Sequence, residues 1–312
     1  MSTTATFQEV ARLWKEDKRK WIKPSTYATY VNHVNKHLLP FFGAMQPEQF
    51  TEAQVQEYVN GQLGHIRTGT IRDSLMVLRM ILRFGRKYCD WPPVEFDVHF
   101  PPSSGGNRAI PVLLPADQRR LLGYLSTHFS FRNLGLAICL HTGLRIGEVC
   151  ALQWKDLDVD TGVIHVRKTI QRIWIHDGAE QSYTLSVGVP KTLTSNRDIP
   201  ICHELMKSLR PLRKVMADDF YVLSNDAEPL EPRYYRDYFR KLLVQLGLPP
   251  IRFHGLRHSF ATRCIESKCD YKTVSAILGH SSIATTLDLY VHPGFDEKKK
   301  AIERMAKALR IR

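Results

Sequence analysis

The chain has 312 residues, and its 44 Lys and Arg outnumber its 31 Asp and Glu, which gives a net charge of +13. A 43% hydrophobic share is enough for a buried core, so disordered and fibrous classes are excluded, and the length is typical of about two domains. The longest apolar stretch, 134–140, is too short to cross a bilayer, and the N-terminus lacks a signal peptide. We therefore expect a cytoplasmic protein with a polyanionic partner and no membrane.

Helical patterns occupy the first 90 residues. Thr6 and Glu9 have the spacing of a capping box before an apolar stripe, and Pro24-Ser25 precedes a second stripe that extends to Leu38. Thr51 and Gln54 form a similar start, and a fourth stripe covers about 70–87. The sequence predicts a small bundle of four helices.

A proline-rich segment with a Ser-Ser-Gly-Gly run occupies 91–115 and predicts a linker. We therefore divide the chain into a helical domain, 1–104, which ends in this linker, and a second domain, 105–312.

The fourth helix carries polar and basic side chains that leave two interpretations open. A solvated charged face is the common outcome for such a helix, but this one also fits a helix that lies in a DNA groove. On the second interpretation the candidate DNA contacts are Thr68, Thr70, Arg72, Arg79 and Arg86.

After the linker the pattern becomes mixed α+β, mainly helical. Segments 163–170, 172–176 and 183–189 are β-branched and alternate, which predicts one small antiparallel sheet. Helices are expected at 117–127, 131–141, 205–215, 234–246, 254–267, 272–278, 283–291 and 296–309. Six cysteines without a Cys-x-x-Cys pair predict reduced, mostly buried thiols, and neither disulfides nor a structural zinc site.

Four short motifs concentrate cationic or nucleophilic residues beside a turn or a helix start. In Thr-Gly-Leu-Arg-Ile-Gly-Glu, 142–148, a glycine turn places Arg145 at a helix start and Glu148 one turn later. Lys191 lies in a polar turn, Pro-Lys-Thr. The other motifs are His-Gly-Leu-Arg-His at 254–258 and Leu-Gly-His at 278–280, the latter followed ten residues later by a tyrosine. Each motif alone is a weak signal.

Together the four motifs meet the needs of phosphodiester transfer. Such a reaction needs cations for the phosphate oxygens, a proton donor, imidazoles and a nucleophile. The candidates in these roles are Arg145 and Arg257, Lys191, His254 and His280, and Tyr290. A zinc site at His254 and His258 is not favoured, because Gly255 stands where a metalloprotease needs glutamate. We expect no metal and no cofactor.

This ordered set, from Thr-Gly-Leu-Arg-x-Gly-Glu to the tyrosine, resembles the tyrosine recombinase (phage integrase) family. The N-terminal segments Lys-Pro-Ser-Thr-Tyr, 23–27, and His-Leu-Leu-Pro-Phe-Phe-Gly, 37–43, resemble the core-binding domain of conjugative-transposon integrases. The resemblance implies a SAM-like helical domain and a catalytic domain that form a C-shaped clamp around DNA. It also implies supporting roles for Glu148 and His258.

The resemblance further implies a site-specific recombinase that integrates, excises or inverts a DNA element. By this resemblance we expect Tyr290 to form a 3′-phosphotyrosine and the strands to exchange through a Holliday junction. The implied partners are double-stranded DNA with paired half-sites and further copies of the chain, in a homotetramer whose subunits exchange their C-terminal tails. Accessory or directionality proteins are left open as further partners. The implied location is the bacterial cytoplasm or nucleoid. No separate arm-binding domain is expected before Thr6, as in Xer-like enzymes. A catalytically silent DNA-binding regulator and a type IB topoisomerase are the alternatives.

Overall fold

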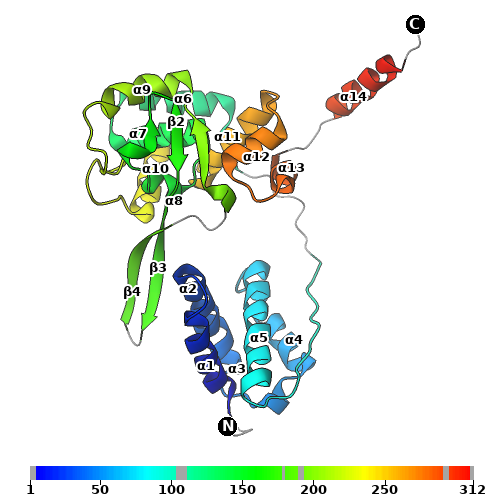
Figure 1. Ribbon diagram of the computed structural model, residues 1–312. Coiled ribbons are helices and arrows are strands. Elements are labelled where there is room, and N and C mark those ends of the chain that lie inside the picture. Colours follow the sequence, from blue (N-terminus) through cyan, green and yellow to red (C-terminus); the bar gives the residue numbers. More distant parts are fainter. Residues whose placement is uncertain (1–4, 103–110, 178–179, 189–192, 291–294, 310–312) are drawn as a thin grey trace. The chain divides into compact units, whose positions relative to one another are not determined.

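The computed structural model describes residues 5–102, 111–177, 180–188, 193–290 and 295–309 (Figure 1). The chain divides into two compact units. Unit 1 consists of residues 1–107 with 173–184, and unit 2 consists of residues 108–172 with 185–312.

Unit 1 is helical, as its sequence predicts. The expected caps are present, because Thr6 and Glu9 form the capping box and the Thr51 hydroxyl accepts the Gln54 N–H. The second predicted helix is not a single regular α-helix, because it contains a π-helical turn, Val34–Leu38. The α-helices are α1 (Phe7–Arg19), α2 (Pro24–His33), α3 (Leu39–Phe42), α4 (Glu52–Gln62) and α5 (Thr68–Tyr88). Their shared core is aromatic, with Phe7, Trp14, Phe42 and Tyr58 buried.

Residues 91–100, here called the strap, pack on unit 1 although their sequence predicts a linker. Trp91 is 3% exposed and Phe96 is 9% exposed, so both side chains belong to the core. Gln56 of α4 pairs with the backbone of His99, accepting its N–H at 2.8 Å and donating to its carbonyl at 3.1 Å. Because Gly85 has no side chain, the Trp91 ring can lie against α5, where a Cβ would be only 3.1 Å away. The strap is therefore a structural part of unit 1.

Unit 2 is built around α7 (Phe131–Thr142), which is almost entirely buried. A Cβ on Gly135 would lie 2.0 Å from Leu223, so glycine is required for the close packing of this helix. The other helices are α6 (Pro115–Thr127), α8 (Ile146–Cys150), α9 (His203–Arg213), α10 (Pro232–Gln245), α11 (His254–Glu266), α12 (Tyr271–Leu278), α13 (Ile283–Tyr290) and α14 (Phe295–Ala308). These bounds agree with the predicted helices to within a few residues.

The strands form two sheets, so the prediction of one sheet was wrong. The three-stranded sheet has the order β1 (Leu157–Asp158), β2 (Val163–Val166), β5 (Arg197–Pro200), with antiparallel pairing. The two-stranded sheet pairs β3 (Thr169–Asp177) with β4 (Glu180–Gly188). The sequence missed β5 because Arg197 occupies one of its buried positions, which conceals the alternation of apolar and polar residues.

The thiols also differ from expectation, because only half of the six are buried: Cys89, Cys139 and Cys150. In the part of the chain that the structure describes, no helix is long and apolar enough to cross a membrane.

Candidate active site

Arg145 is placed by a glycine turn, as its sequence motif predicts. Gly143 ends α7 in the left-handed conformation, with φ of 66°, and α8 begins at Ile146, so Arg145 is the N-cap residue. The Glu148 carboxylate accepts the backbone N–H of Arg145 at 2.9 Å and its Nη1 at 2.7 Å. The Arg145 side chain remains 34% exposed, so it can still reach a ligand.

Arg257 lies in α11 and is only 2% exposed. Its Nη1 donates to the Gly143 carbonyl at 3.0 Å, and its Nη2 donates to the Leu278 carbonyl at 2.7 Å. A buried guanidinium needs such acceptors, because an unpaired charge in the protein interior is costly. Arg257 thus joins the end of α7 to the end of α12.

Three arginines bind successive carbonyls at the C-terminal end of α12. The Ile277 carbonyl accepts from Arg197, the Leu278 carbonyl from Arg257, and the Gly279 carbonyl from Arg145 at 3.2 Å. The last carbonyls of a helix lack partners within the helix and carry partial negative charge, so cations stabilise them. The three guanidinium groups therefore gather around the peptide that immediately precedes His280.

His280 lies between α12 and α13, and its Nδ1 is 2.8 Å from the Thr286 hydroxyl. Burial, followed by the positive charges of Arg257 and Arg145, lowers the pKa of His280 from 6.5 to about 4. The ring is therefore neutral at pH 7.

His254 and His258 stand one turn apart on α11, with their rings perpendicular and 4.6 Å between centroids. Desolvation lowers the pKa of both, and the positive charge of Arg257 lowers them further. Among the described residues, no group of three His, Cys, Asp or Glu side chains is arranged to hold a metal ion.

The structure brings four of the six predicted catalytic residues into one region of unit 2: Arg145, His254, Arg257 and His280. Tyr290 is the last residue of α13, but its side chain is not described. Lys191 lies outside the described residues, two positions before Leu193 in the sequence.

Sequence analysis missed a role for Arg197, which follows Lys191 by six residues. Arg197 is 8% exposed and donates from Nη1 and Nη2 to the two oxygens of Glu148. The sequence carried no signal for this role, because strand β5, in which Arg197 takes a buried position, was itself not predicted. Thr286, fully buried on α13, was missed as well.

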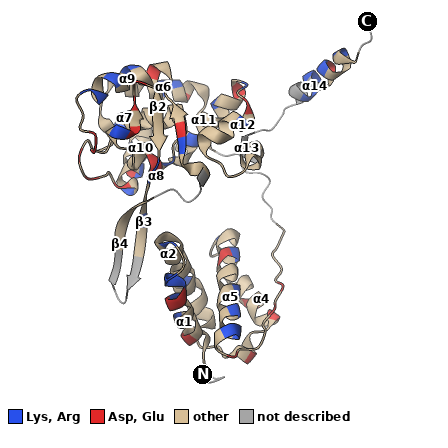
Figure 2. Cartoon of the chain, in the orientation of Figure 1, with Lys and Arg blue, Asp and Glu red and all other residues tan. Residues whose placement is uncertain are grey.

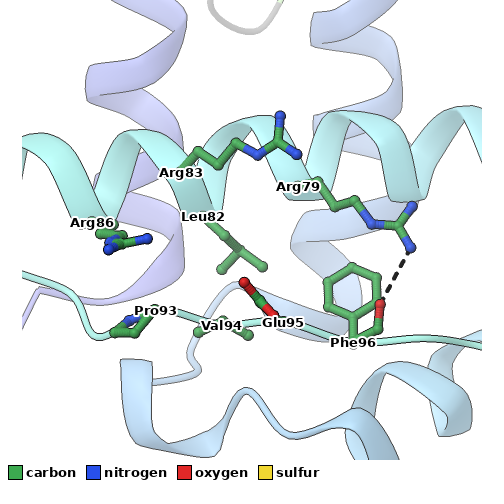
Figure 3. Close-up of a pocket in the computed structure, with 8 residues that line it drawn as sticks. All are labelled: Arg79, Leu82, Arg83, Arg86, Pro93, Val94, Glu95 and Phe96. Carbon is green, nitrogen blue, oxygen red and sulfur yellow. Dashed lines mark hydrogen bonds between the residues drawn. The ribbon is translucent and has the colours of Figure 1, made fainter.

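The candidate DNA contacts lie on α5 of unit 1, which carries several basic residues (Figure 2). Two of them are engaged by the strap, since the guanidinium of Arg72 is 4.8 Å from the Phe100 ring centroid and that of Arg79 is 4.5 Å from the Phe96 ring centroid. A hollow of about 320 Å³ lies between α5 and the strap, and Figure 3 shows the side chains that line it. Its basic lining residues are Arg79, Arg83 and Arg86.

The other candidates on α5 differ in exposure. Thr68 begins the helix and is exposed, as is Arg86, whereas Thr70 is half-buried and its carbonyl accepts from Ser74. The DNA-binding role of all five residues stays a prediction.

Several known proteins are similar in sequence to this chain. The relatives include a XerC-like tyrosine recombinase of Caldanaerobacter subterraneus, 31% identical over 182 residues, which covers 53% of this chain and 46% of the relative. The ICEBs1 integrase of Bacillus subtilis is 26% identical over 318 residues, which covers 91% of this chain and 78% of that integrase. The match thus spans about half the length of the first relative.

Among solved structures, the Tn1549 transposon integrase in complex with transposon right end DNA superposes with a TM-score of 0.77. It is 22% identical, and the match covers 97% of this chain and 100% of that one, which establishes the shared fold. Residues 6–63 match the N-terminal SAM-like domain of phage integrases, and residues 112–297 match the phage integrase family itself. The second match covers more than half of the sequence, and this chain belongs to the phage integrase family.

Proposed function

We propose that this protein is a site-specific tyrosine recombinase that cuts and rejoins double-stranded DNA. The observation that carries the proposal is the convergence of Arg145, Arg257 and His280 at the end of α12. Two cations and a neutral imidazole in one place suit a phosphate whose oxygens gain negative charge in the transition state. Membership of the phage integrase family supports the same reaction.

In the proposed reaction the Tyr290 hydroxyl gives its proton to the neutral imidazole of His254 as its oxygen attacks a backbone phosphate. A phosphorus–oxygen bond to the tyrosine forms, the bond to the 5′ oxygen breaks, and Lys191 gives a proton to that oxygen. The product is a 3′-phosphotyrosine, and a 5′ hydroxyl from a partner strand later reverses the step. One phosphodiester is exchanged for another, so the bond energy is conserved and no nucleotide hydrolysis is needed.

The electrostatics of the described residues support this division of labour. Arg145 is accessible and carries its charge to the substrate, whereas Arg257 acts from a buried position. His254 and His280 are neutral at pH 7, so they serve as hydrogen-bond donors or acceptors rather than as further cations. A neutral imidazole beside a phosphate avoids the cost of burying another charge.

The partners that we propose are duplex DNA with paired half-sites and three further copies of this chain. The helix α14 fits exchange of the tail between subunits, because its apolar residues Ile302 and Met305 are 63% and 53% exposed. Deleting the residues after Pro293 should then impair assembly on DNA while leaving binding of one half-site intact. Unchanged assembly of the truncated chain would count against tail exchange.

Covalent capture tests the proposed reaction. A nicked duplex, made from the DNA that flanks the gene, loses a short 5′-hydroxyl fragment after cleavage and traps the enzyme on the DNA. We expect a denaturation-resistant adduct with the wild type and with Tyr234→Phe, a change of an exposed tyrosine on α10, and none with Tyr290→Phe. Binding without an adduct in the wild type would instead support the silent regulator.

A further inference from the structure

The contact between His280 and Thr286 links the loop after α12 to the helix that ends in Tyr290. Thr286 lies in α13 and is 0% exposed, and its hydroxyl is 2.8 Å from Nδ1 of His280. A threonine within a helix commonly donates its hydroxyl to the carbonyl four residues earlier. Within the described residues, the hydrogen-bond partner of Thr286 is the His280 ring instead.

The direction of this hydrogen bond follows from the burial of Thr286. A hydroxyl has one hydrogen to donate, and a buried donor left without an acceptor costs about 1–3 kcal/mol. Since Nδ1 of His280 is the acceptor within reach, the Thr286 hydroxyl donates and Nδ1 accepts. A neutral imidazole carries a single N–H, so the hydrogen of the ring is then on Nε2.

We propose that Thr286 is a positioning residue that holds His280 as the Nε2–H tautomer, so that the ring donates a hydrogen bond to the scissile phosphate. The tautomer itself follows from the hydrogen bond, and only its consequence for cleavage rests on the proposed function. Because Thr286 and Tyr290 belong to one helix, the same docking of α13 that places the tyrosine backbone also sets the tautomer of His280. The nucleophile and the oxyanion donor become competent together.

The charge state of His280 makes this selection matter. An imidazolium has an N–H on both nitrogens and needs no tautomer selection, but the pKa of His280 is lowered to about 4 by burial and by Arg257 and Arg145. At pH 7 the neutral ring therefore presents either a donor or an acceptor from Nε2. A phosphate offers only hydrogen-bond acceptors. In the Nδ1–H tautomer, Nε2 would therefore direct its lone pair at a negatively charged phosphate oxygen, which is unfavourable.

The first test measures the tautomer directly and needs no DNA. The free protein is labelled with ¹⁵N-histidine. The signals of His280 are assigned as those that are missing from the spectrum of the His280→Asn variant. NMR at pH 7 then shows which ring nitrogen of His280 carries the proton. The proposal requires Nε2 protonated and Nδ1 unprotonated in the wild type. A wild-type ring with its proton on Nδ1 overturns it, whatever the activity.

The second test compares three variants in single-turnover cleavage of the nicked duplex. Thr286→Val keeps the shape but loses the hydroxyl. We expect cleavage about 10–100-fold slower, with DNA affinity changed less than about twofold. This is less than the roughly 100–1000-fold loss for complete removal of one oxyanion donor, because the His280 ring is still present. Thr286→Ser retains the hydroxyl and should stay within about threefold of wild type. The control is Thr285→Val at an exposed neighbouring position, which should cleave like wild type.

Equal cleavage by Thr286→Val and wild type overturns the role in positioning. If melting shows that Thr286→Val is unfolded, the serine variant and the wild-type NMR measurement still decide. Failure of the proposed function has a different signature, namely the expected tautomer in a protein that forms no covalent adduct.

Discussion

The two terminal nitrogens of Arg197 donate hydrogen bonds to the buried carboxylate of Glu148, with Nη1 3.1 Å from Oε1 and Nη2 3.0 Å from Oε2. The same carboxylate is 2.7 Å from Nη1 of Arg145. Burial opposes ionisation of Glu148, but the hydrogen bonds and charge of Arg197, aided by Arg145, outweigh it and hold its pKa below the ordinary value. Because Arg197 balances this carboxylate, the positive charge of Arg145 remains available to a phosphate.

Replacing Arg197 should cost both stability and catalysis. Arg197→Met leaves the buried Glu148 carboxylate short of one partner, and we expect a loss of about 3–5 kcal/mol in the free energy of unfolding, measured with urea. The control is Arg240→Met, which breaks an exposed pair with Asp237 and should cost under about 1 kcal/mol.

A second change distinguishes charge balance from simple packing. Adding Glu148→Gln to Arg197→Met removes the surplus negative charge, so the double variant should regain part of the lost stability. A double variant no more stable than Arg197→Met, or equal costs for the Arg197 and Arg240 variants, would contradict the account.

Gly279 is a sensitive position because it combines backbone strain with close packing. Its φ is 66°, and a Cβ would lie 2.8 Å from the Thr194 carbonyl and 3.0 Å from the Arg197 side chain. We expect Gly279→Ala to destabilise the protein by about 1–3 kcal/mol and to slow cleavage by displacing His280. Gly123→Ala in α6 meets nothing within 4 Å and should instead be neutral or stabilising by about 0.5–1 kcal/mol. Thermal melting of the two alanine variants checks the contrast.

The contacts of α5 with the strap indicate different roles for two neighbouring arginines, Arg79 and Arg83. Arg79 covers the Phe96 ring and donates to its carbonyl, so Arg79→Ala should lower the stability of unit 1 by about 1 kcal/mol. Arg83 is exposed, and Arg83→Ala should instead reduce the slope of log affinity for DNA against log salt by about one, with little change in stability. Filter binding at 50–200 mM salt and urea unfolding separate the two effects, and interchanged results would refute this assignment.

The lowered pKa of His280 predicts loss of stability in acid. The unfolded chain binds a proton near pH 6.5, whereas the folded ring resists it until about pH 4, so stability is lost as pH falls through this window. We expect His280 to contribute on the order of 1–2 kcal/mol of this loss, since solvent still reaches the ring. Urea unfolding at pH 7 and pH 4.5 should show a smaller loss for His280→Asn than for wild type. Equal losses would mean that the ring titrates normally.

The sequence predicted what local patterns determine. Caps at Thr6 and Thr51 depend on residues three positions away, and the turn at Gly143 needs only glycine at a helix end, so these features were readable from the chain. The contact between Arg145 and Glu148 was also predictable from their motif, because the two residues are one helical turn apart.

The remaining features depend on partners distant in sequence. Residues 91–100 are rich in proline and resemble a linker, and only the packing of Trp91 and Phe96 on α5 makes them part of unit 1. Arg197 meets Glu148 across 49 residues, and no periodicity reports that contact. Thr286 was hidden for another reason, since a single buried threonine in an apolar helix gives no chemical signal until its histidine partner is located.

The identity of the residue joined to DNA tests the central claim most directly. The trapped adduct is digested with protease and nuclease, and mass spectrometry locates the nucleotide on a peptide. The account predicts a 3′-phosphate linked to Tyr290 and to no other residue. A nucleotide on another side chain, or a 5′-phosphate linkage, would contradict it.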